Sequence, residues 1–208
     1  RVLPAKDPLR PDEPSVGQFA WQMRLLREHF QPLPLLEAVQ RLKGGSLPSR
    51  AVCVTFDDGY ADNAQCAMPV LKRYAIPATV FVSTGFLNGG RMFNDTVIEA
   101  IRGLSGDYID LRDQGEISDS KAQLETLLQQ DVHLFAYPNG RPAIDYQDEH
   151  RSMVKNSGFL AAVSTHWGAA TNESDPYQLP RFTPWDRTTA RFAARLLLNY
   201  RSGDSLVG

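Results

Sequence analysis

The stretch Ala51-Val52-Cys53-Val54-Thr55-Phe56-Asp57-Asp58-Gly59-Tyr60 decides the interpretation of this chain. Its first six residues are β-branched or apolar and predict a fully buried strand, which ends abruptly at two carboxylates. Neighbours along a strand point to opposite sides, so the two acids can take different roles only if the backbone turns there, and Gly59 permits a turn. Apolar residues at helical spacing over 60–74 then predict a helix. Strand, acidic turn and helix together are typical of an α/β protein with its active site at the carboxyl ends of its strands.

Two interpretations of the acidic pair are open at this point. Carboxylates suit a helix N-terminus, so Asp57 and Asp58 could simply begin the following helix. However, the pair directly follows a buried strand and lies at the rim of the core, where an unpaired charge is costly. This position favours a metal-binding or catalytic role.

The rest of the chain alternates between helical and extended patterns. This alternation predicts an α/β fold with parallel strands inside and helices outside. The expected helices cover 16–30, 35–43, 96–104, 118–130, 145–156 and 188–200, and the expected extended segments cover 78–84, 132–137, 159–165 and 178–183.

The bulk composition narrows the function classes. With 208 residues the chain is expected to form one domain, preceded by an irregular, proline-rich leader over 1–14. The net charge of -2, from 22 basic and 24 acidic residues, gives no indication of a nucleic-acid partner. The apolar runs are strand-sized, so no transmembrane segment is expected. Cys53 and Cys66 are expected to be buried free thiols.

Four ordered blocks make the chain resemble a known family. They are Thr55-Phe56-Asp57-Asp58-Gly59-Tyr60, Pro77-Ala78-Thr79-Val80-Phe81-Val82, Phe135-Ala136-Tyr137-Pro138-Asn139-Gly140 and Leu179-Pro180-Arg181-Phe182. In this order they resemble the polysaccharide deacetylases, the NodB-type enzymes of carbohydrate esterase family 4. The resemblance implies a deformed (β/α) barrel over residues 1–208. It also implies a metal-dependent hydrolase that removes N-acetyl groups from aminosugar residues of a bacterial polysaccharide or oligosaccharide.

The form of the third block, Tyr-Pro-Asn-Gly, resembles deacetylases that act with bacterial exopolysaccharide systems. This resemblance favours the cell envelope or periplasm over the cytoplasm as the compartment.

The resemblance also implies roles for individual residues. Asp57 would be the general base, and Asp58 would be a ligand of a divalent metal such as Zn²⁺. Many relatives have an arginine that orients this Asp, but the aligned position here is Ala136. Arg181 is the candidate to replace it by holding Asp57 in a bidentate pair, with Arg141 as second choice. The backbone N–H of Asn139 would stabilise the oxyanion, and His166 is the candidate general acid. The candidate substrate-binding residues are Tyr60, Tyr137, Pro138 and Trp185. The alternatives for these positions are a plain turn at 137–140, core packing for Trp185, surface roles for Arg181 and Arg141, and an exposed histidine at 166.

The chain departs from the family where two metal-binding histidines are expected. The His-x-x-x-His pair of the family is absent, and the sequence passes at Gly115-Glu116 from the start of one family pattern directly into the next. We hypothesise that the printed sequence omits a segment there, and a second one near Gly106-Asp107; the alternative is a true deletion. One carboxylate and one histidine would make a weak site, because catalytic zinc usually has three protein ligands.

Other functions fit less well. A carbohydrate-binding or regulatory protein on the same fold, without the metal and the activity, is the first alternative. A phosphatase with an aspartyl nucleophile ranks lower because its second Asp usually lies two positions later. A calcium loop fits least, because alternating oxygen ligands are absent.

Overall fold

A computed structural model describes residues 1–8, 10–87, 117–138, 140–183, 186 and 188–201. Several predictions therefore lie outside the described residues. They are the helix at 96–104, the two proposed omissions at 106–107 and 115–116, Asn139 and Trp185.

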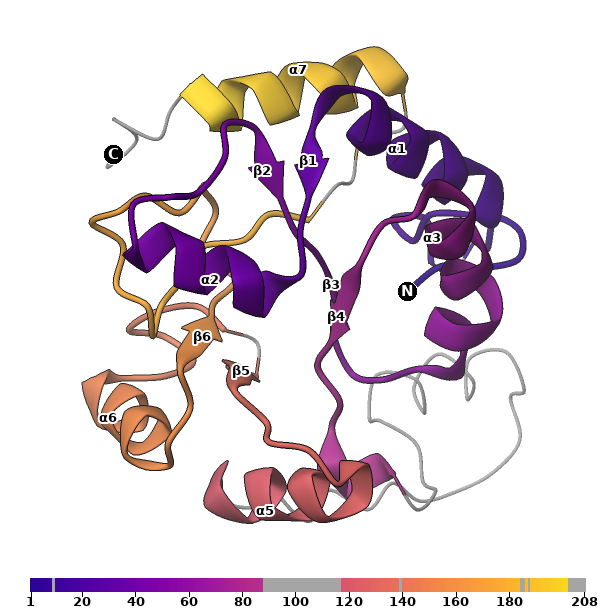
Figure 1. The fold of residues 1–208 in the computed structure, drawn as a ribbon. Coiled ribbons are helices and arrows are strands. Elements are labelled where there is room, and N and C mark those ends of the chain that lie inside the picture. The colour runs from indigo at the N-terminus through magenta and orange to yellow at the C-terminus, as the bar shows by residue number, and fades with distance from the viewer. Residues whose placement is uncertain (9, 88–116, 139, 184–185, 187, 202–208) are drawn as a thin grey trace, which may run out of the picture.

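The first part of the chain pairs two helices with two very short strands (Figure 1). Helix α1 (Val16–His29) begins where the Ser15 hydroxyl accepts a hydrogen bond from the backbone N–H of Gln18, at 3.3 Å. Strand β1 (Gln31–Pro32) pairs in parallel with β2 (Ala51–Val52) across helix α2 (Leu35–Lys43). Strand β1 was not expected from the sequence, because a strand of two residues is too short to show an alternation of apolar and polar side chains.

The stretch with the acidic pair forms the next unit. Strand β3 (Val54–Phe56) pairs in parallel with β4 (Ala78–Val80), with Thr55 opposite Thr79. Between them lies the expected helix, which begins with the π-helical turn η1 (Asn63–Ala67) and continues as α3 (Met68–Tyr74). A single 3₁₀ turn, η2 (Thr84–Phe86), follows β4.

The expectation of one fully buried strand over 51–56 was wrong. Cys53 separates β2 from β3, which pair with different partners. Of these six residues only Phe56 is buried in the core beneath α1. The other five are half-buried, and two of them, Val52 and Val54, pack against the same core.

The C-terminal part repeats the same unit. It contains α5 (Ile117–Leu128), β5 (Leu134–Ala136), α6 (Asp148–Asn156), β6 (Ala161–Val163) and α7 (Thr189–Arg201). Strands β5 and β6 pair in parallel, and Val163 also bridges to Leu179, within the expected extended segment. Helix α7 returns across the molecule to pack near α1 (Figure 1).

The parallel strand pairing of the expected fold is confirmed, but the closed barrel is not. The described strands form three separate two-stranded sheets. The main apolar core lies between α1, α3, α7 and β3, and two smaller clusters lie around β5 and β6. Within the described ranges, no helix is both long and apolar enough to span a membrane.

Candidate active site at the end of β3

The backbone turns sharply directly after β3, as the sequence predicts. Asp58 and Gly59 both have φ of +73°, in the left-handed region that glycine tolerates best. A Cβ at Gly59 would lie only 2.7 Å from Cγ1 of Val82, so a larger residue cannot take this position without a shift. The turn leaves the side chains of Asp57 and Asp58 exposed at the carboxyl end of the strand.

Arg181 reaches this corner from the C-terminal part of the chain. Its Nη1 donates to Oδ1 of Asp57 at 2.8 Å and to Oγ1 of Thr55 at 3.3 Å, while Nε donates to the backbone carbonyl of Ser164 at 3.0 Å. The expected ion pair is therefore present. The expected bidentate geometry is wrong, because Nε is directed to the carbonyl at the end of β6.

The two members of this pair differ in exposure. The Arg181 side chain is 16% exposed and that of Asp57 48%. The arginine is thus held by the fold, while the carboxylate it orients remains accessible to water and to a substrate.

The turn at Tyr137–Gly140 lies at the same edge. The backbone N–H of Thr165 donates to the carbonyl of Gly140 at 2.8 Å, and the N–H of Arg181 donates to the carbonyl of His166 at 2.9 Å. The acidic corner, Arg181, the end of β6 and this turn are therefore joined by consecutive short contacts. This is the arrangement expected for strands of one α/β sheet whose carboxyl ends meet.

His166 is exposed at this edge, directly after the last residues of β6. Its backbone is fixed on both sides, since its N–H also donates to the hydroxyl of Ser164 at 3.2 Å. The role of its imidazole as general acid stays a prediction.

The substrate-binding role of Tyr137 needs correction. Its ring is 4% exposed and stacks on the ring of Tyr146, with centroids 3.7 Å apart. Its hydroxyl donates to the carbonyl of Tyr177 at 3.0 Å, and burial raises the pKa of the phenol far above its usual value. Tyr137 is thus a core residue, whereas the neighbouring Pro138 is exposed.

The remaining candidates are Arg141, Asn139, Trp185 and Tyr60. Arg141, the second choice for holding Asp57, instead pairs with Asp145 at 2.8 Å, and this contact holds the pKa of the Asp145 carboxyl below its usual range. Asn139 and Trp185 lie outside the described residues. Tyr60 is half-buried, with the guanidinium of Arg1 4.0 Å from its ring centre.

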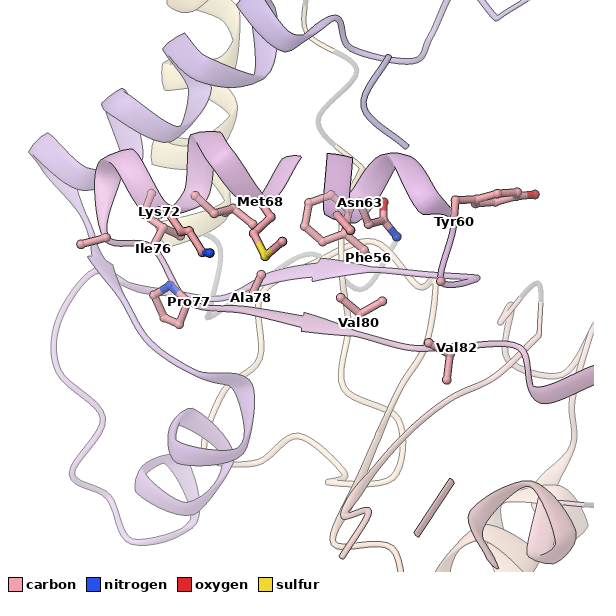
Figure 2. Close-up of a pocket in the computed structure, with 14 residues that line it drawn as sticks. Phe56, Tyr60, Asn63, Met68, Lys72, Ile76, Pro77, Ala78, Val80 and Val82 are labelled. Carbon is pink, nitrogen blue, oxygen red and sulfur yellow. The ribbon is translucent and has the colours of Figure 1, made fainter. Parts of the chain in front are cut away.

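A groove lies behind the corner, on the helix side of β3 and β4 (Figure 2). It has a volume of about 670 Å³ and an apolar lining that includes Phe56, Met68 and Val80, and it ends at Tyr60. Neither Asp57 nor Asp58 lines it. Asn63 is 9% exposed, and both atoms of its side-chain amide lack a hydrogen-bond partner in the part of the chain that the structure describes.

The described residues do not fit a zinc site by themselves. No group of three or more His, Cys, Asp or Glu side chains converges within the described ranges, which contain all four histidines and both cysteines of the sequence. Among the described residues the acidic corner offers the carboxylates of Asp57 and Asp58, and that of Asp57 is engaged by Arg181. Catalytic zinc usually needs three protein ligands.

Sequence reasoning missed two residues that hold Arg181. Thr55 was inside the quoted block, and its spacing of two from Asp57 indicates that both side chains point to the same side of β3. Ser164 contributes through its backbone carbonyl, and no side-chain pattern in the sequence could indicate that contact.

Comparison with known proteins agrees with this arrangement. Residues 44–101 match the family model for polysaccharide deacetylase. The chain is 30% identical over 179 residues to the putative polysaccharide deacetylase YxkH of Bacillus subtilis, over 79% of this chain and 63% of that protein. These matches relate the chain to the polysaccharide deacetylases, whose family model covers residues 44–101.

A second curated relative has a named activity of its own. The chain is 27% identical to the poly-beta-1,6-N-acetyl-D-glucosamine N-deacetylase of Staphylococcus aureus strain MSSA476 over 196 residues, which cover 80% of this chain and 66% of that protein. The chain thus spans about two thirds of the length of these curated relatives.

Solved structures of deacetylases share the fold. The deacetylase PplD of Streptococcus pyogenes, solved in complex with acetate, superposes with a TM-score of 0.71 at 23% identity and covers 96% of this chain and 94% of its own. IcaB from Ammonifex degensii gives a TM-score of 0.67 at 22% identity with the same coverage. At this level of identity the similarity supports a barrel-like α/β fold.

Proposed function

We propose that this chain hydrolyses N-acetyl groups on aminosugar residues of a bacterial polysaccharide, releasing acetate and leaving a free amine. The observation that carries the proposal is the contact between Arg181 and Asp57 at the carboxyl edge of the strands. It supplies an exposed carboxylate in a fixed orientation, which is what a general base requires. The name of the Staphylococcus aureus relative supports a β-linked N-acetylglucosamine polymer as the substrate class.

The chain's own residues give the proton transfers of this hydrolysis. Asp57 takes a proton from a water molecule as the water oxygen attacks the acetamide carbonyl carbon. The C–N bond then breaks, and the amine leaves with a proton for which His166 is the candidate donor. The backbone N–H of Asn139 is the candidate partner of the oxyanion.

A divalent metal, Zn²⁺ by family resemblance, is the proposed cofactor, with Asp58 as one ligand. Since the described residues do not form a complete site, its other ligands would have to come from residues 88–116 or from a segment that the printed sequence omits.

The direct test is acetate release from an N-acetylglucosamine hexamer, measured after chelation and again after addition of Zn²⁺. We expect Asp57→Asn to lower kcat by about 10²- to 10⁴-fold, the usual contribution of a general base. Asp175→Asn is the matched control, because Asp175 pairs with Arg151 at 2.9 Å on another part of the fold. Absence of acetate release by the wild-type protein under both metal conditions would overturn the proposal.

The incomplete metal site favours one second candidate, a carbohydrate-binding protein that has lost the activity. That protein would bind the hexamer without releasing acetate, at any metal concentration. Titration of the hexamer by calorimetry beside the acetate assay separates the two functions.

A further inference from the structure

Trp167 is a large aromatic side chain held at the surface beside the candidate active site. It lies in the loop after β6, three residues beyond Ser164, and is 41% exposed. The preceding residue, His166, accepts the backbone hydrogen bond of Arg181. Because Arg181 in turn holds Asp57, the loop that carries Trp167 is fixed to the same edge as the acidic corner.

The indole is held by neighbours from two other segments. The ring of Phe182 lies 6.2 Å from it, centroid to centroid, at an interplanar angle of 22°. The guanidinium of Arg195, on α7, lies 4.9 Å from the centre of the Trp167 ring. These contacts fix the ring before any ligand binds, which lowers the entropic cost of binding.

Arg195 is itself anchored. Its Nη2 donates to Oδ1 of Asp186 at 2.9 Å, and its Nε contacts the other carboxylate oxygen. Asp186 is 6% exposed, and its backbone carbonyl accepts a hydrogen bond from Gln18 at 3.3 Å. The Arg195 side chain is 34% exposed, so part of it remains accessible to a ligand.

We propose that Trp167 and Arg195 form a subsite for a sugar ring of the polysaccharide, outside the residue that is deacetylated. The inference rests on the function proposed above. A pyranose ring has apolar C–H groups on its faces and hydroxyls around its edge, so it matches the exposed part of an indole that has a cationic donor over its ring. A polymer that follows the carboxyl edge from the acidic corner would reach this pair.

The experiment compares an N-acetylglucosamine dimer with the hexamer, because only the longer substrate can occupy both places. We expect Trp167→Ala to lower the ratio of kcat/KM for the hexamer over the dimer about five- to tenfold, through KM, as suits the loss of a few tens of Å² of apolar contact. Trp167→Phe, which keeps a ring, should retain most of this ratio. Leu160→Ala is the matched control, since Leu160 is 40% exposed at the opposite end of β6, and it should leave the ratio unchanged.

A titration with the glucosamine hexamer, the expected product, tests the subsite without hydrolysis. We expect its dissociation constant to rise about five- to tenfold in Trp167→Ala and to stay within twofold in Leu160→Ala. If the wild-type protein releases no acetate yet shows this difference in binding, the subsite stands and the proposed reaction falls. Equal loss on dimer and hexamer, or no change in either substrate or in the titration, overturns the subsite.

Discussion

Replacing Arg181 tests the arrangement on which the proposed catalysis depends. Arg181→Met removes the 2.8 Å contact with Asp57 and leaves a side chain of similar length. In our mechanism Arg181 is a positioning residue, because it holds the base and does not contact the substrate. The substitution should therefore lower kcat and leave KM nearly unchanged.

The size of the effect follows from the contact. A hydrogen bond between charged groups contributes about 1.5–3 kcal/mol, and the lower part of this range applies because Asp57 is 48% exposed and partly screened by water. About 1.5 kcal/mol corresponds to roughly tenfold in rate. Misplacement of the freed base can add to this, so we expect a loss of about 10- to 100-fold in kcat. Arg181→Lys keeps the charge without the fork and should recover part of the loss.

The same change also affects stability. The carbonyl of Ser164 loses its side-chain donor, and a buried polar group left without a partner costs about 1–3 kcal/mol. Arg151→Met is the control. Arg151 pairs with Asp175 at a distance of 2.9 Å, and neither residue belongs to the acidic corner. Arg151→Met should lower the free energy of unfolding without lowering kcat. Acetate release from Arg181→Met within twofold of wild type, by protein shown to be folded in a thermal melt, would refute the reasoning.

Three further predictions concern the walls of the site. Gly59→Ala should lower the free energy of unfolding, measured in urea, by about 1–3 kcal/mol, because the position has a positive φ and a Cβ there would lie 2.7 Å from Val82. Adding Val82→Ala should recover only the part of this loss that comes from the steric contact. If the single variant loses no stability, the turn is not strained. Asn63→Leu should raise the free energy of unfolding by about 1 kcal/mol, because it removes a buried amide that lacks partners among the described residues, and a decrease would indicate that the amide is needed. Arg195→Met should destabilise the protein by about 2–4 kcal/mol at pH 7, because it leaves the carboxylate of Asp186 buried without its partner. Hydrogen bonding from Arg195 lowers the pKa of Asp186, so this difference should be full above about pH 4 and shrink as the pH falls through the lowered pKa; a difference that does not change with pH would refute it.

The sequence predicted the parts of the fold that rest on strong local patterns. The helices at α1 and α2 have apolar residues at helical spacing and clear ends, and both were predicted within a residue. The turn after β3 was predicted because two carboxylates and a glycine cannot continue a buried strand. The contact between Arg181 and Asp57 was predicted by seeking a replacement for the family arginine that is absent at Ala136, since 124 residues separate the two and no local pattern connects them.

What the sequence could not predict depends on long-range partners. The division of 51–56 into β2 and β3 follows from their pairing with β1 and β4. Strands of two or three residues are too short for a pattern of alternating side chains to reveal them. Tyr137 was expected to line the pocket because it lies at the end of a strand, yet its ring is buried in the core, where it stacks on Tyr146. Side-chain direction at a strand end is decided by such neighbours.

Side chains along β3 point alternately to opposite sides, and this couples the acidic corner to the apolar groove behind it. Thr55 and Asp57 both contact Arg181, whereas Phe56 lies between them and lines the groove on the opposite side. Gly59 closes the turn against Val82, which also lines the groove (Figure 2). A change in the packing of the groove must therefore move the strand that carries the base. Activity should accordingly respond to substitutions of groove residues such as Phe56 and Val82, which have no proposed role in the reaction.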